Sequence, residues 1–89
     1  MMKSLLVILK EEDNAVHVYN RNVNAIHLFV REREIVKANP FDCETKSEAI
    51  LQYNELISEY EKKAEEEKQK VNQARKELRN YISMLLENE

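Results

Sequence analysis

The sequence predicts an α+β protein, in which an N-terminal antiparallel sheet of three or four strands precedes one long C-terminal helix. Two observations lead to this fold class. Residues 45–89 contain neither glycine nor proline, and their apolar residues recur in steps of three and four. Residues 1–44 are rich in Val, Ile and aromatic residues that alternate along short runs between polar clusters. We therefore expect one structural unit with a small antiparallel sheet over 1–44 and a dimerisation helix over 45–89.

The sheet is expected to begin with a continuous apolar run that is typical of a strand buried on both faces. The next runs alternate between aliphatic side chains and polar or aromatic ones, as half-buried strands do. The polar residues between the runs are interpreted as turns, because Asn and Asp tolerate turn geometry. The four expected strands cover residues 4–10, 15–20, 25–31 and 34–38.

A helix is the alternative for residues 25–38. Asn24 would cap it, and Asn39-Pro40 would end it. Its apolar residues would cover more than half of the helix surface, and its β-branched and aromatic content favours a strand. The sequence leaves both interpretations open for this segment.

The long helix is expected to begin with the capping box Thr45-Lys46-Ser47-Glu48, in which Thr45 and Glu48 satisfy backbone amides reciprocally. At about 1.5 Å per residue it would span about 65 Å, so its packing seam is too long for the preceding residues to cover. We expect the seam to form a dimer interface with the residues Ile50, Tyr53, Ile57, Tyr60, Ala64, Glu67, Val71, Ala74, Leu78, Tyr81 and Leu85.

Charges beside the seam predict an antiparallel homodimer centred near residue 69. In that register Glu61 faces Arg75 of the second copy, whereas a parallel dimer places like charges opposite each other. Residues 45–67 carry three Lys and seven Glu, a net charge of −4, and residues 68–79 carry five Lys or Arg and one Glu, a net charge of +4. Antiparallel pairing lays the acidic part on the basic part.

Two other uses of the seam are compatible with the sequence. Its first part, Ile50 to Tyr60, is also expected to pack on the sheet of its own chain. Alternatively, the helix bends near residue 69 into a hairpin, which the lack of Gly and Pro disfavours.

The composition argues against an enzyme. A chain without glycine cannot form the phosphate-binding loops that depend on it. The potential metal ligands lack the close paired spacing of known sites, and nothing orients a base beside the single cysteine. We therefore expect no cofactor, no metal site and no catalytic residue. The residues that could have supplied such a site are His17, His27, Asp42, Cys43 and Glu44.

Two surfaces are candidate binding sites. The outer face of the expected sheet has the composition of a protein interface, and either a second copy or another protein would cover it; its residues are His17, Tyr19, His27, Phe29 and Arg31. A basic run on the helix is the alternative site, for phosphate or another anion; its residues are Lys68, Lys70, Arg75 and Arg79.

The function expected from these features is non-enzymatic protein binding by a homodimer in the cytoplasm. The apolar run at the N-terminus is too short for a signal peptide or a membrane span. An excess of Lys, Glu, Asn and Ile suggests an AT-rich genome, such as that of a low-GC bacterium or its phage, and hence an inhibitor or adaptor acting on a host protein complex. The alternative is a regulatory or sequestering protein that binds nucleic acid or a small anionic ligand at the dimer interface, and a purely structural coiled coil is a third option.

Overall fold

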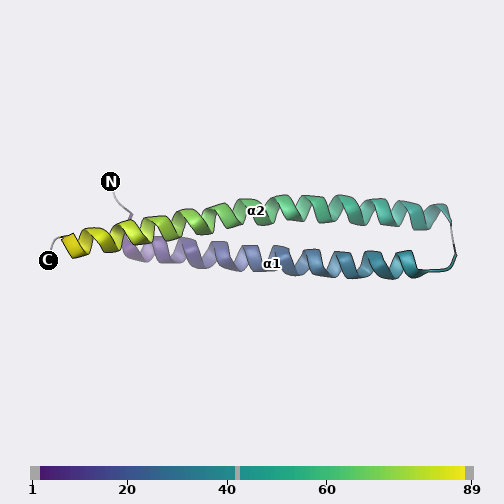
Figure 1. Cartoon of the computed structure of the whole chain (residues 1–89), viewed down its shortest axis with the longest axis horizontal. Coiled ribbons are helices and arrows are strands. Elements are labelled where there is room, and N and C mark those ends of the chain that lie inside the picture. Colours follow the sequence, from purple (N-terminus) through teal and green to yellow (C-terminus); the bar gives the residue numbers. More distant parts are fainter. Residues whose placement is uncertain (1–2, 42, 88–89) are drawn as a thin grey trace.

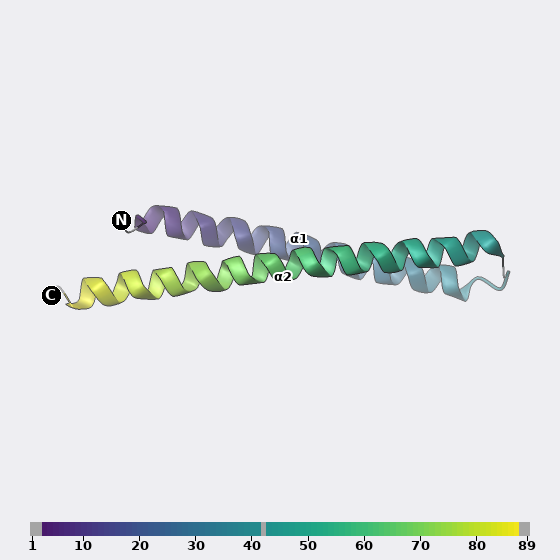
Figure 2. The same ribbon diagram turned by 90° about the horizontal axis from the view of Figure 1, so that it is seen from above.

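The chain folds into a hairpin of two long antiparallel helices. The computed structural model describes residues 3–41 and 43–87. Helix α1 covers Leu5–Ala38 and helix α2 covers Glu44–Glu87, and they lie side by side along the whole of α1 (Figure 1). The rod measures 70 × 18 × 15 Å. Seen from above, the helices cross at a shallow angle, as coiled-coil partners do (Figure 2).

The predicted sheet is wrong, because the described part of residues 1–44 contains no strand. All four expected strands lie within α1 except for Ser4, which is the N-cap of that helix. The alternative for residues 25–38 is right in being helical and in ending before Asn39-Pro40, but that helix begins far upstream of Asn24. The fold class is therefore all-α, with two helices of 34 and 44 residues.

Helix α1 has its own packing seam, with the same steps of three and four as the seam of α2. The pattern is hard to see in the sequence because three of the ten positions are polar or charged. Ile8 and Ala15 are buried on it, and so is the side chain of Asn22. The α1 seam consists of Leu5, Ile8, Glu12, Ala15, Tyr19, Asn22, Ile26, Phe29, Arg33 and Val36.

Local hydrogen bonds fix both ends of α1. Ser4 is the N-cap, and its hydroxyl accepts a hydrogen bond from the backbone amide of Val7 at 3.3 Å. At the other end, the amide of Asn39 donates to the carbonyl of Val36 at 3.2 Å. Pro40 then ends the helix, because a residue before proline is disfavoured in helical geometry.

The connection between the helices is short and held by Asn39. Its side-chain oxygen accepts a hydrogen bond from the amide of Phe41 at 2.9 Å, and its carbonyl accepts one from Lys46 Nζ at 2.7 Å. Helix α2 begins at Glu44, so Thr45 lies inside the first turn and not at the cap position predicted for it. The first helical hydrogen bond of α2 runs from the amide of Ser47 to the carbonyl of Cys43 at 3.2 Å.

The seam of α2 packs on α1 of the same chain. Every residue of that seam except Leu85 is buried or half-buried. Cross-helix contacts run along the hairpin, including an edge-to-face pair of Phe29 and Tyr60 with centroids 5.3 Å apart and a hydrogen bond from Arg33 Nη1 to Asn54 Oδ1 at 2.9 Å. The surface assigned to an α2–α2 homodimer is thus covered within the monomer.

The core is thin, because two helices can bury only one stripe each. Among the residues that the structure describes, six apolar side chains are buried and three of them are alanines, namely Ala15, Ala64 and Ala74 beside Ile8, Ile57 and Val71. No helix in the described ranges is both long enough and apolar enough to cross a membrane.

Candidate functional site

The hairpin has two long sides, one on either side of the line where the helices meet. We call one the ion-pair flank; it is lined by Lys3, Glu11, Asn14, Ala15, Glu67, Lys70, Gln73, Ala74 and Glu77. We call the other the basic flank; it is lined by Glu12, Val16, Tyr19, Asn20, Lys68, Val71, Asn72, Arg75, Leu78 and Arg79.

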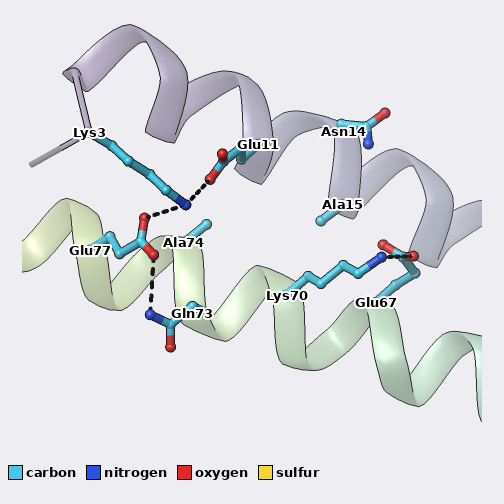
Figure 3. Close-up of a pocket in the computed structure, with 9 residues that line it drawn as sticks. All are labelled: Lys3, Glu11, Asn14, Ala15, Glu67, Lys70, Gln73, Ala74 and Glu77. Atoms are coloured by element: carbon cyan, nitrogen blue, oxygen red, sulfur yellow. Dashed lines mark hydrogen bonds and ion pairs between the residues drawn. The ribbon is translucent and has the colours of Figure 1, made fainter. Parts of the chain in front are cut away.

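The charges of the ion-pair flank are paired with one another (Figure 3). Lys3 Nζ lies 3.0 Å from Glu11 Oε2 and 3.5 Å from Glu77 Oε2, and Gln73 Nε2 donates to Glu77 Oε1 at 3.2 Å. The hydrogen bond to Glu11 is the main reason that the pKa of Lys3 lies above its usual 10.5. These contacts hold the residues before α1 onto α2, so this flank serves mainly to close the open end of the hairpin.

One atom of that network is incompletely satisfied. Glu77 Oε2 is buried and has no hydrogen bond within the described residues, although Lys3 Nζ lies 3.5 Å away. We interpret the contact as an ion pair without good hydrogen-bond geometry, since 3.5 Å exceeds the usual range for a charged hydrogen bond.

The basic flank differs because its cations are nearly free. Arg75 Nε is 4.0 Å from Glu12 Oε2, the limit of an ion pair. Across residues 3–41 and 43–87, Lys68 and Arg79 have no carboxylate within 4 Å. Helical spacing places Lys68, Asn72, Arg75 and Arg79 on one stripe of α2. This stripe places three positive charges along one side of α2.

Three of the four residues predicted for anion binding lie together on the basic flank: Lys68, Arg75 and Arg79. The fourth, Lys70, lies on the ion-pair flank, where its Nζ is 3.0 Å from Glu67 Oε1. The structure therefore brings three of these cations to one side and separates the fourth.

The residues predicted for partner binding do not share one face. His17, His27 and Arg31 are exposed on the outside of α1, and His17 Nε2 lies 3.4 Å from Asp13 Oδ1. Tyr19 lines the basic flank. Phe29 is in the α1 seam against Tyr60. A pattern of alternate residues defines a face only on a strand, and on a helix it distributes the same side chains around the axis.

The described ranges contain no group of three or more His, Cys, Asp or Glu side chains that could hold a metal ion. His17 and His27 are ten residues apart on one helix, about 15 Å along its axis, and not on neighbouring strands as the sheet implied. Cys43 is exposed in the connection between the helices, and Asp42 lies outside the described residues.

The sequence-based interpretation missed an apolar surface at the open end of the hairpin. Helix α2 extends past the start of α1 (Figure 1). Both helix ends carry large apolar side chains there. Their exposed fractions run from 36% to 67%. The signal was present as two apolar runs near the ends of the chain. We call this the open-end surface; it consists of Leu5, Leu6, Val7, Leu9, Ile82, Met84, Leu85 and Leu86.

Comparisons of the chain with models of protein families, with curated proteins and with solved structures find no significant match.

Proposed function

We propose that this protein is a non-catalytic protein-binding module, and that its first partner is a second copy of itself. The observation that carries the proposal is the open-end surface. Eight large apolar side chains are exposed there, together on the order of several hundred Å². Exposed apolar area of that size at one end of a small protein favours an interaction there, because leaving it in water is unfavourable.

The thin core supports self-association. Two helices without a further layer bury little apolar area, and chains of this size commonly gain stability by oligomerisation. Because half of the buried apolar residues are alanines, the stabilisation from burial within one chain is small. A second hairpin would add a second layer and a shared core, as in four-helix bundles.

Light scattering on the purified protein tests this proposal. We expect a dimer at micromolar concentration, and a shift toward monomer for the variant Leu6→Ser with Leu86→Ser. The matched control is Leu28→Ser with Ile35→Ser, because these residues are similarly exposed, at 49% and 65%, but lie on α1 away from the open end. A wild-type monomer, or equal effects of the two variants, would overturn the proposal.

An inhibitor or adaptor acting on a host protein complex is the concrete form of this function that the composition favours. His17, His27 and Arg31 are available for such a partner, since all three side chains are exposed. Affinity capture should recover a protein that also binds the purified hairpin directly. That binding should weaken for His27→Ala with Arg31→Ala, and unchanged binding would exclude these residues.

Anion binding is the second candidate function, and the grouping of Lys68, Arg75 and Arg79 on the basic flank favours it. A salt titration with a labelled single-stranded oligonucleotide tests it, because phosphate contacts make affinity fall steeply with salt. Lys68→Gln with Arg79→Gln should abolish binding. The control, Lys62→Gln with Lys76→Gln, removes the same charge from exposed positions outside the basic flank and should leave binding nearly unchanged.

A further inference from the structure

We propose that the second copy lies antiparallel on the basic flank, related by a two-fold axis that passes between Lys68 and Asn72. This inference rests on the self-association proposed above and names its surface and register. The paired helices would be α2 with the partner's α2 and α1 with the partner's α1, which gives a four-helix bundle with connections at opposite ends.

The first support is a charge pattern along α2, in which, across the described ranges, Arg75 alone has an oppositely charged group within 4 Å, Glu12 at 4.0 Å. Glu61, Glu65, Lys68, Arg75 and Arg79 follow one stripe at helical spacing, acidic before basic. Both glutamates are exposed, and in the part of the chain that the structure describes neither has a cation within 4 Å. The stripe is therefore complementary to an inverted copy of itself.

The charges select one register. With the axis near residue 70, Glu61 faces the partner's Arg79 and Glu65 faces the partner's Arg75, which makes four attractive pairs per dimer. Moving the axis half a heptad toward the C-terminus sets Lys68 against the partner's Arg79. Moving it equally far the other way leaves only the pairing of Glu65 with the partner's Lys68. Such differences decide register more than they add affinity.

The second support is independent and comes from α1. Leu9, Val16, Val23 and Val30 repeat every seven residues on the same side of α1 as the basic flank. Leu9 is 44% exposed and the three valines are half-buried. Around Val16, the neighbouring α2 side chains include Lys68 and Arg75 beside Val71, so its outward side has little apolar cover.

The two supports define the same axis. Val16, Lys68 and Asn72 line one hollow, so they lie at one level of the hairpin. An axis through that level sets Val16 against its own copy and Leu9 against the partner's Val23, apolar on apolar. Placing α1 over the partner's α2 would instead set the valines against charged side chains, which is unfavourable for both.

The overlap is large enough for a stable dimer and covers part of the open end. Residues 54–86 of α2 would face their copies over about 50 Å. With a rod 18 Å wide, each subunit buries about 900 Å², against about 800 Å² in a standard interface. Leu86 reaches the partner's Asn54, one helical turn from the partner's Leu51, which is itself 61% exposed.

Charge reversal in mixed pairs tests the register. Glu61→Arg with Glu65→Arg should weaken self-association at least about tenfold, and Arg75→Glu with Arg79→Glu should do the same, because each variant sets like charges opposite each other. An equimolar mixture of the two should form a heterodimer by native mass spectrometry, since all four pairs are then attractive. The chain with all four reversals should dimerise again, which also shows that the substitutions permit folding.

Disulfide trapping tests the axis directly. In a Cys43→Ser background, Val16→Cys should crosslink to its own copy on mild oxidation. Val30→Cys makes the same change on the same strip, two heptads away from the axis, and should not crosslink. Equal crosslinking of the two, or homodimers unaffected by charge reversal, would overturn the inference while leaving dimerisation intact. A wild-type protein that is monomeric would instead refute the proposed function.

Discussion

Ile8 is the side chain whose truncation best tests the hairpin. It is only 2% exposed, although it lies near the open end of α1. Truncating a buried Ile to Ala costs about 2–5 kcal/mol, and a site one turn from a helix end can partly collapse, so the lower half of that range applies. Alanine also favours the helix by about 0.4 kcal/mol. We expect Ile8→Ala to lower the free energy of unfolding by about 2 kcal/mol, or Tm by about 8–16 °C.

The matched control is Ile35→Ala, the same chemical change in the same helix at a side chain that is 65% exposed. Its effect should stay within about 0.5 kcal/mol, as at other surface positions. Urea and thermal unfolding followed by far-ultraviolet circular dichroism measure both, at one fixed protein concentration because self-association shifts apparent stability. If Ile8→Ala matches Ile35→Ala, the first turns of α1 do not pack on α2, and the hairpin register is wrong.

Three further predictions concern the contacts between the helices. Asn22 is a buried polar side chain that is 7% exposed. In the same unfolding assay, Asn22→Leu should stabilise the hairpin by about 1–2 kcal/mol, because the substitution removes a buried amide. Unchanged stability would show that the side-chain amide of Asn22 is well hydrogen-bonded. Tyr53 donates a hydrogen bond to Glu32 at 2.9 Å, which raises the pKa of Tyr53 above its usual 10.0. The stabilisation from this hydrogen bond should be fully present below pH 10 and lost as the pH rises through the folded-state pKa. Wild type and Tyr53→Phe should therefore converge in stability at high pH. A double-mutant cycle on Phe29 and Tyr60 should give a coupling of about 0.5–1.5 kcal/mol, and additivity of the single Leu variants would argue against their edge-to-face contact.

The sequence predicted α2 well because its seam is mostly apolar and its surface mostly charged. Ile57, Ala64 and Val71 repeat every seven residues, two steps of three and four apart, and all three are buried. The lack of Gly and Pro after residue 45 left no place for the helix to break. The start was misplaced by one or two residues, which is the usual uncertainty of a helix end.

Helix α1 was missed because polar residues interrupt its apolar seam and valines lie beside that seam. Glu12, Asn22 and Arg33 occupy seam positions and break the apolar repeat. Valines on either side of the seam, such as Val16 and Val18, then create a two-residue alternation that imitates a strand. Packing against α2 outweighs the weak β preference of these residues.

The candidate site was predicted only in part for the same reason. The basic stripe of α2 was found because it depends on one helix whose periodicity was right, and the structure adds that Lys70 points to the other flank. The open-end surface was missed because it arises from two segments distant in sequence. The start of α1 and the end of α2 come to the same end of the molecule only when the chain forms a hairpin (Figure 1).

The polar residues of the α1 seam also explain why α2 pairs with α1 before it meets a second copy. Glu12 lies 4.0 Å from Arg75 and Arg33 donates to Asn54 across the hairpin, so these charged seam residues have polar contacts here that an arbitrary partner would not supply. The connection between the helices is short, so closing the hairpin costs little entropy compared with bringing together two separate chains. An α2–α2 dimer through the seam would have to displace α1, which is covalently linked to α2 and already packs on that seam. Self-association is therefore expected on a surface that the hairpin leaves uncovered, and the unpaired acidic and basic groups of the α2 stripe beside the valines of α1 provide one.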